Sequence, residues 1–283
     1  MAYGTVNVPG VTGAELEAVR KIAQAAKETA EAAQEAITEM TTKISAVPSQ
    51  GGVPTYNGQA QSPSWNNYDP NALEIGGTQS ATDAGTYQVT FTPKEGYKWE
   101  DDTTGAKTVN WTIGRANIAT PSQSGSLTYT GSAQSPTWLN YDESKLTLGG
   151  TTQATDAGTY EATFTPKSGF KWSDDTETAK TVQWTINRAS IATPTPSGSL
   201  TYTGSAQSPT WANYDSGKMT LGGTNSGTNA GSYTATFTPG KNYQWSDGTT
   251  TAKSITWKIN KAAGSLTLNK SSLTLSGGTA TGT

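Results

Sequence analysis

Two residue types that serve most enzyme active sites are missing from this chain. None of its 283 residues is cysteine or histidine. The sequence can therefore form no disulfide, no thiolate nucleophile, no imidazole general base and no Cys/His zinc cluster. The carboxylates, lysines, tyrosines and hydroxyls that remain recur evenly along the chain. We expect a protein that is not an enzyme and that carries no cofactor and no metal.

Positive charge and long apolar runs are also scarce. The net charge is −3 and the pI is near 5.1, which offers no basic surface to nucleic acid or anionic lipid. No apolar stretch approaches the roughly 20 residues that span a bilayer. The start, MAYGTVNVPGVTG, lacks the cationic and then apolar pattern of a secretory signal. We expect a chain made in the cytoplasm without a signal peptide, with no nucleic-acid partner and no membrane insertion.

What the sequence does contain is one block that occurs three times at a spacing of 73 residues, read without insertion or deletion. The block carries all nine tryptophans in three sets: Trp65, Trp138 and Trp211; Trp99, Trp172 and Trp245; Trp111, Trp184 and Trp257. This period exceeds the roughly 20 to 50 residues of solenoid repeats and suits a small domain that folds by itself. We predict domains at 46–116, 117–189 and 190–262, called here the first, second and third repeats. Their junctions contain no Gly/Ser linker, which favours a semi-stiff array.

Each repeat has the alternation of β-strands. In the second repeat, Tyr160, Ala162 and Phe164 share one face of a strand, and Val182, Trp184 and Ile186 share one face of another. Such alternation, broken by Gly, Pro and Asp clusters, predicts antiparallel sandwiches. The fold class expected is mainly all-β, with a helix in front.

Residues 14–45 are rich in Ala, Glu, Lys and Gln and contain neither Gly nor Pro, which predicts one long helix. Small or apolar residues recur at alternating steps of three and four over about four heptads, the pattern of a coiled-coil helix. This heptad seam consists of Leu16, Val19, Ala23, Ala26, Ala30, Ala33, Ile37, Met40 and Ile44.

The favoured interpretation of the seam is a homo-oligomer formed through the helix. The alternatives are a single helix docked on another protein, or an alanine-rich helix of marginal stability, because four alanines bury little area. Residues 1–13 read as an extended attachment segment or as a frayed terminus. Residues 263–283 read as the opening of a further β domain that is cut short, or as a swapped hairpin.

The segment Asp83-Ala84-Gly85-Thr86-Tyr87 recurs at 156–160 and, with two changes, at 229–233. It is similar to the Asp-x-Gly-x-Tyr corner of immunoglobulin domains, in which the tyrosine lies two residues before a core cysteine. The resemblance implies a structural corner at Tyr87, Tyr160 and Tyr233. The cysteine positions hold Val89, Ala162 and Ala235, so the sandwich must be held by packing alone.

The longer pattern, from Thr-Tyr-Thr-Gly-Ser-Ala-Gln-Ser-Pro to Trp-Thr-Ile-Asn-Arg-Ala, resembles bacterial Ig-like repeats of the MBG type. The final SLTLNKSSLTLSGGTATGT resembles the start of a group 2 bacterial Ig-like domain. These resemblances imply a modular surface protein, of the kind found in bacterial adhesins and in the tail fibres, spikes and capsid decorations of bacteriophages.

We favour a structural appendage protein of a bacteriophage virion, displayed on the virion surface beside other virion proteins for adhesion to a host surface or its glycans. A bacterial adhesin or stalk, and a carbohydrate-binding array of a larger enzyme, are the alternatives. The absence of a signal sequence favours the virion.

Three sets of residues are candidate sites. Trp99, Trp172 and Trp245 stand beside acidic turns and are candidates for stacking on a glycan, against the alternative that they cap the core; Trp111, Trp184 and Trp257 are expected in the core. The acidic turns at Asp101, Asp174 and Asp247 suit polar hairpins better than calcium. Lys107, Lys180 and Lys253 resemble the lysines of isopeptide crosslinks, although solvated lysines at a strand edge are the favoured interpretation.

Overall fold

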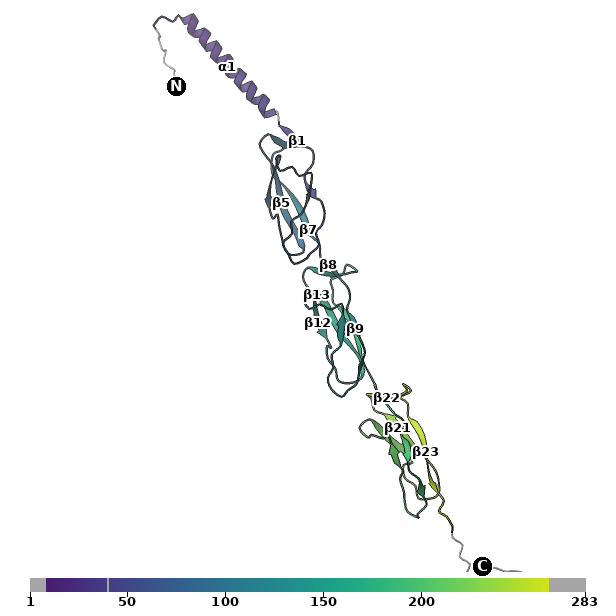
Figure 1. Cartoon of the computed structure of the whole chain (residues 1–283). Helices are drawn as coiled ribbons and strands as arrows, with labels where there is room; N and C mark the ends of the chain where they lie inside the picture. Colours follow the sequence, from purple (N-terminus) through teal and green to yellow (C-terminus); the bar gives the residue numbers. More distant parts are fainter. Residues whose placement is uncertain (1–8, 40, 265–283) are drawn as a thin grey trace, which may run out of the picture. The chain divides into compact units, whose positions relative to one another are not determined.

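The computed structural model describes residues 9–39 and 41–264, and Figure 1 follows them from the amino-terminal helix through the three repeats. The described residues form one α-helix followed by strands only. The predicted fold class, mainly all-β sandwiches behind a long helix, is confirmed. The chain divides into two compact units. One unit contains the residues up to Ala119 together with Pro166–Thr178, and the other contains Thr120–Thr165 and the residues from Ala179 onward. The limits of the repeats in sequence are therefore not the limits of the compact units.

Each repeat has one main sheet. In the first it is β4 (Leu73–Gly77), β5 (Gly85–Pro93) and β7 (Lys107–Ile113), with Thr55 bridged to Gly114. The second has the order β10 (Leu127–Thr128), β15 (Lys180–Asn187), β13 (Gly158–Pro166) and β12 (Leu146–Gly150). The third repeats this order with β18 (Leu200–Thr201), β23 (Lys253–Asn260), β21 (Gly231–Pro239) and β20 (Met219–Gly223). The two-residue strands β10 and β18 are parallel to their neighbours.

Short strand pairs complete each repeat. The antiparallel pairs are β2 (Ser49–Gln50) with β3 (Trp65–Asn66), β9 (Ser122–Ser124) with β11 (Thr137–Leu139), and β17 (Thr195–Ser197) with β19 (Thr210–Ala212). The parallel pairs are β1 (Thr42–Ile44) with β6 (Tyr97–Trp99), β8 (Ala116–Ile118) with β14 (Phe170–Trp172), and β16 (Ala189–Ile191) with β22 (Tyr243–Trp245). The parallel pairs tie the first strand of each repeat to a strand late in that repeat.

The core lies under the alternating faces of the two long strands. In β13 the side chains of Ala162 and Phe164 are buried, and in β15 those of Trp184 and Ile186 are buried, as predicted. The same positions are buried in every repeat, and the first core consists of Leu73, Val89, Phe91, Trp99, Trp111 and Ile113. Because Trp, Phe and Ile recur at these buried places, three sandwiches can be built on one pattern, although Ala162 and Ala235 stand where the first repeat has Val89.

The helix α1 spans Gly13–Glu39, not 14–45 as predicted. A capping box starts it: the Thr12 hydroxyl accepts from the Glu15 backbone N–H at 3.4 Å, and the Glu15 carboxylate accepts from the Thr12 N–H at 2.7 Å. The predicted seam residue Ile44 instead lies in β1, paired with Trp99 and packed against the first core. The predicted seam residue Met40 lies outside the described residues.

The position of β1 also changes the predicted alignment of the first repeat with the other two. Ile44, Ile118 and Ile191 hold the same place, opposite Trp99, Trp172 and Trp245. Three residues lie between Ile44 and the buried Pro48, but two lie between Ile118 and the buried Pro121. The first repeat therefore has one extra residue here, and the spacing is not free of insertions. The repeats begin at Thr42, Ala116 and Ala189, slightly earlier than the predicted 46, 117 and 190.

The predicted attachment segment 1–13 and the predicted further domain 263–283 lie for the most part outside the described residues.

Replacing Ile44 by alanine is expected to lower the free energy of unfolding of the first repeat by about 1–2 kcal/mol, because a partly buried side chain is removed from the core. Native-state hydrogen exchange of the β5 and β7 amides measures this. Val19→Ala is the control, since Val19 is 60% exposed on α1. Equal protection in the Ile44→Ala variant and the control would contradict the assignment of Ile44 to the core.

Candidate functional site

The surface of α1 is the first candidate interface. Every side chain described on this helix, through Ala36, is exposed. Leu16 is 37% exposed, Val19 60% and Ile22 69%. These apolar side chains therefore have no cover from the described part of the chain. Ile22 borders the predicted seam and was not part of it, although its position three residues after Val19 was a signal for it.

Two ion pairs lie beside this apolar face. Glu17 pairs with Arg20 at 3.9 Å, and Lys27 pairs with Glu31 at 3.7 Å. Both pairs are exposed and stabilise the helix little. The helix is thus amphipathic, with one face of small and apolar residues and another of paired charges.

The tryptophans proposed to stack on glycans are not at the surface, which corrects that prediction. Trp99 is 1% exposed, and Trp172 and Trp245 are 0% exposed. Each indole N–H donates to a carbonyl six residues onward, at 2.8–2.9 Å, in Gly105, Thr178 and Thr251. A buried indole N–H needs an acceptor, and the loop that follows the acidic turn supplies it. No ring face of this set can stack on a sugar.

The second core set is where the alternation predicted it. Trp111, Trp184 and Trp257 are at most 2% exposed, and their indole N–H groups donate at 2.7 Å to the carbonyls of Thr78, Thr151 and Thr224. The remaining set is only half-buried. Trp65, Trp138 and Trp211 lie edge-on to Phe91, Phe164 and Phe237, with ring centroids 4.8–5.0 Å apart. These three are the tryptophans that retain some exposed surface.

The corner tyrosines close the turn before the longest strand. The Tyr87 hydroxyl donates to the Asp83 carbonyl at 2.8 Å, Tyr160 to that of Asp156 at 2.7 Å, and Tyr233 to that of Asn229 at 2.7 Å. A bond from the hydroxyl to backbone a few residues upstream is the tyrosine-corner geometry of Ig domains. The motif holds the main sheet and contributes no binding site.

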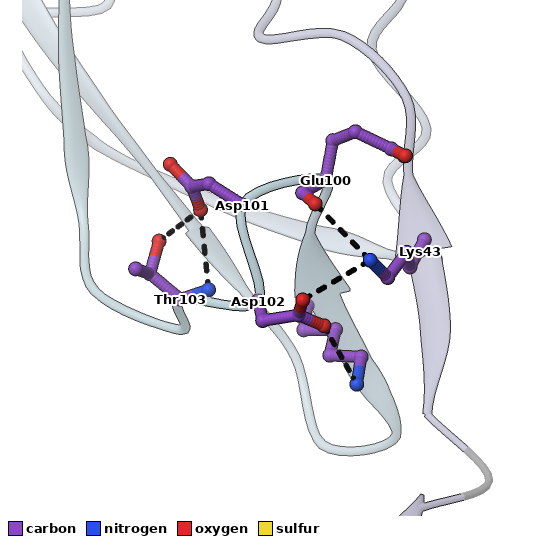
Figure 2. Close-up of polar contacts among 6 residues, drawn as sticks. Lys43, Glu100, Asp101, Asp102 and Thr103 are labelled. Carbon is purple, nitrogen blue, oxygen red and sulfur yellow. Dashed lines mark hydrogen bonds and ion pairs between the residues drawn. The ribbon is translucent and has the colours of Figure 1, made fainter.

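The acidic turns are occupied by the chain's own donors. In Figure 2, the Asp101 carboxylate accepts from the backbone N–H and the hydroxyl of Thr103, at 3.1 and 2.6 Å. Asp102 accepts from Lys43 at 3.2 Å, and the same Nζ donates to the Glu100 carbonyl at 3.2 Å. Lys43 lies on β1, so these contacts fasten the first strand of the repeat to the turn after β6.

The recurrent lysines pair with these turns. The Nζ of Lys107 lies 2.7 Å from Asp101, and that of Lys253 lies 2.5 Å from Asp247. Each ammonium also lies over a buried indole, Trp99 at 5.1 Å and Trp245 at 5.4 Å. The Lys107 hydrogen bond is the largest cause that lowers the pKa of Asp101 to about 2, followed by the hydrogen bonds from Thr103. Hydrogen bonding by Lys253, and then by Thr249, lowers the pKa of Asp247 as well.

Metal-binding clusters and membrane-spanning helices are two further features that could mark a site. Among residues 9–39 and 41–264, no group of three or more acidic side chains is placed to hold a metal ion. In the same residues, no helix is both long and apolar enough to cross a membrane.

The pairing of Asp101 makes the first repeat sensitive to acid. Its folded-state pKa is depressed, so its contribution to stability is present above about pH 4 and is lost as the pH falls to about 2. Asp101→Asn is expected to unfold at a lower temperature than the parent chain at pH 6, and the difference should vanish near pH 2. Calorimetry at several pH values measures this. Glu95→Gln removes one negative charge from the same repeat as a control, and an equal pH dependence in both variants would contradict the prediction.

The second and third repeats meet through a polar cluster inside one compact unit. Asn242 is buried, at 7% exposure; its amide donates to Asp156 at 2.8 Å and its oxygen accepts from the Ala157 N–H at 2.9 Å. Lys241 pairs with Asp156 at 2.7 Å, and Arg188 donates to the Lys241 carbonyl at 3.0 Å. The loop before β22 is thereby held to the tyrosine corner of the second repeat.

The loop before β14 is equivalent to the loop before β22, but it contacts the first repeat through different residues. Gly169 stands in the place of Asn242, and the Tyr56 ring fills the space where a side chain at Gly169 would lie. Tyr56 packs edge-on against Phe170, with centroids 5.3 Å apart, and Arg115 pairs with Glu177 at 2.8 Å. All four side chains belong to the same compact unit.

Removing the Asn242 amide should leave the Ala157 N–H without its partner, at a cost of about 1–3 kcal/mol. For Asn242→Ala we expect the local opening free energy at Ala157, measured by hydrogen exchange, to fall by that amount. Asn260→Ala removes an amide whose bond to Ser199 is exposed, and it should leave Ala157 unchanged. Unchanged protection in Asn242→Ala would show that the cluster does not hold the loop.

Comparison with known proteins identifies the fold of one part of the chain. Residues 102–187 match a family model described as "Putative Ig domain". This stretch covers the end of the first repeat and nearly all of the second, and it supports the Ig-like interpretation of the repeats. No curated protein matches the chain.

One solved structure that the chain matches is the Bacteroides ovatus mixed-linkage glucan utilization locus SGBP-B in complex with a mixed-linkage heptasaccharide. It is 11% identical, with 76% of this chain and 71% of that chain covered, and the TM-score is 0.17. At that score the likeness says nothing about what this chain binds.

Proposed function

We propose that the chain is a structural appendage protein of a bacteriophage virion, a tail or head fibre or a capsid decoration. In this proposal the amino-terminal helix assembles several copies and joins them to other virion proteins. The Ig-like repeats are displayed on the virion surface for adhesion to the host surface or its glycans. The chain is made in the host cytoplasm and has no catalytic role.

The observation that carries this proposal is the uncovered apolar face of α1 next to three repeated sandwiches. A helix of 27 residues with Leu16, Val19 and Ile22 exposed gains stability from a partner, because its heptad spacing fits another helix. Partner copies of the same chain supply identical heptads. Assembly would bring several sets of repeats to one place, and weak contacts would then add by avidity.

The Ig-like repeats support a role in display rather than in chemistry. Their buried tryptophans, corner tyrosines and paired acidic turns are all engaged in holding the sandwiches. The same arrangement occurs three times, so each copy of the chain would display one kind of surface three times.

Assembly can be tested with matched charge substitutions on α1. Ala23→Glu with Ala30→Glu places two carboxylates in the seam and is expected to give monomers, because like charges would face each other in the oligomer. Ala25→Glu with Ala32→Glu places the same charges on the opposite face and should leave the oligomer intact. Sedimentation and light scattering measure the mass of the parent chain and both variants.

A parent chain that is monomeric at high concentration would contradict assembly through α1. Equal dissociation of both double variants would point to a loss of solubility or of helix rather than to the seam. The virion assignment has its own test in the genes that flank the coding sequence. Capsid or tail genes are expected; a cell-wall anchor or a catalytic domain in the same reading frame would contradict the assignment.

A further inference from the structure

The third repeat lacks a bridge between its sheets that the first two repeats have. In the first repeat, the Gln50 side-chain amide donates to the Thr112 carbonyl at 2.9 Å and its oxygen accepts from the Thr112 N–H at 2.9 Å. In the second, Gln123 makes the same two bonds with Thr185, at 3.1 and 2.9 Å. One carboxamide thus satisfies both backbone groups of one residue on the last long strand.

Proline replaces this glutamine in the third repeat. Pro196 follows Gln123 by the repeat spacing, and Lys258 follows Thr185 by the same spacing. A proline side chain has neither donor nor acceptor, so the bridge cannot form. Pro196 and Lys258 are exposed, whereas Gln50, Gln123, Thr112 and Thr185 are half-buried.

The backbone of Lys258 nevertheless has the orientation found in the other repeats. Lys258 pairs with Ser232 in the register in which Thr112 pairs with Thr86 and Thr185 pairs with Thr159. Its N–H and C=O therefore face away from β21, toward the place of the missing glutamine. A groove of about 260 Å³ occupies that place, lined by Pro196, Leu200, Pro209, Trp257 and Lys258 among others.

We propose that this groove is a binding site for a primary carboxamide, the side chain of a glutamine in a peptide ligand. The Lys258 N–H and C=O bind the carboxamide as the backbone of Thr112 and Thr185 binds Gln50 and Gln123. Pro196, Leu200 and Pro209 offer apolar walls to the methylenes of the glutamine side chain. The site is independent of assembly through α1 and of the virion assignment.

The geometry selects a primary over a secondary amide. The N–H and C=O of one extended residue face the same side, so the ligand must present a donor and an acceptor side by side. A primary carboxamide does this with the N–H that lies on the same side as its oxygen. In a trans secondary amide the N–H and the C=O point in opposite directions, so only one bond can form. Acetamido sugars and peptide bonds are therefore poor ligands for this pair.

Two isomers of one composition provide the test. Propionamide is a primary amide and N-methylacetamide is a trans secondary amide with the same atoms. Each is titrated into the isotope-labelled full chain while the backbone amides are followed by NMR. We expect a saturable shift of the Lys258 amide with propionamide, no such shift at Thr112 or Thr185, and affinity for N-methylacetamide weaker by about tenfold, the equivalent of one hydrogen bond.

Variants at one position separate this site from general solvent effects. Pro196→Gln should supply the bridge internally and abolish the saturable shift, whereas Pro196→Ala, which provides no carboxamide, should retain it. Should Pro196→Gln fail to fold, Gln123→Pro is expected to open a second site, reported by the Thr185 amide. A short peptide with a central glutamine should compete with propionamide, and its glutamate analogue should not.

Three results would each overturn the proposal. They are equal effects of the two isomers, a shift that does not saturate, and a saturable shift that is retained in folded Pro196→Gln. Failure of the glutamine peptide to compete would overturn the assignment of a glutamine ligand. The NMR titrations do not measure the mass of the oligomer. The carboxamide site and assembly through α1 can therefore be contradicted independently of each other.

Discussion

Every sandwich in this chain depends on burying indole rings without leaving their N–H groups unpaired. Without cysteine, the repeats have no covalent link between sheets, and two fully buried tryptophans per repeat provide much of the packed volume. A buried indole N–H needs an acceptor, and each one finds a loop carbonyl at 2.7–2.9 Å. The loops that supply these carbonyls are thereby fixed as well. Each buried tryptophan therefore determines both the packing of the core and the conformation of one loop. This explains why the buried tryptophans recur together in every repeat.

Much of the fold could be predicted from the sequence, because alternation records which face of a strand is buried. Ala162 and Phe164 were placed correctly on this basis, as were Trp184 and Ile186. Trp99 and its equivalents were misjudged because an acidic turn in sequence suggests exposure. The ring is in fact buried, and its indole N–H bonds to a carbonyl six residues onward, in the loop after the turn. Ile44 was assigned to the helix because its spacing fits a heptad, but pairing with Trp99 draws it into the core.

Differences between the repeats could not be interpreted from sequence alone. The change from Gln123 to Pro196 looks minor on the surface of a strand, yet it removes two hydrogen bonds that join the sheets. Its meaning depends on which backbone groups lie opposite, and that is a matter of three-dimensional register. Ile22 was missed for a different reason, since a strict heptad seam describes a narrower face than the apolar face that α1 exposes. The residues that the repeats share determine the common fold, and the residues that differ between repeats determine the contacts that are specific to one repeat.

The loops before β14 and β22 contact the preceding repeats through different residues. Tandem domains of similar sequence are prone to dock on, or exchange strands with, the wrong neighbour. The Tyr56 ring fills the space where a side chain at Gly169 would lie, whereas the equivalent Tyr129 packs against Tyr243, beside a loop that carries Asn242. Asp156, in turn, binds Lys241 and Asn242, for which the earlier loop offers only Ser168 and Gly169. The faces that receive these loops nevertheless keep the same residue types, Tyr56 and Asp83 in the first repeat and Tyr129 and Asp156 in the second, so the loops alone make the two contacts different.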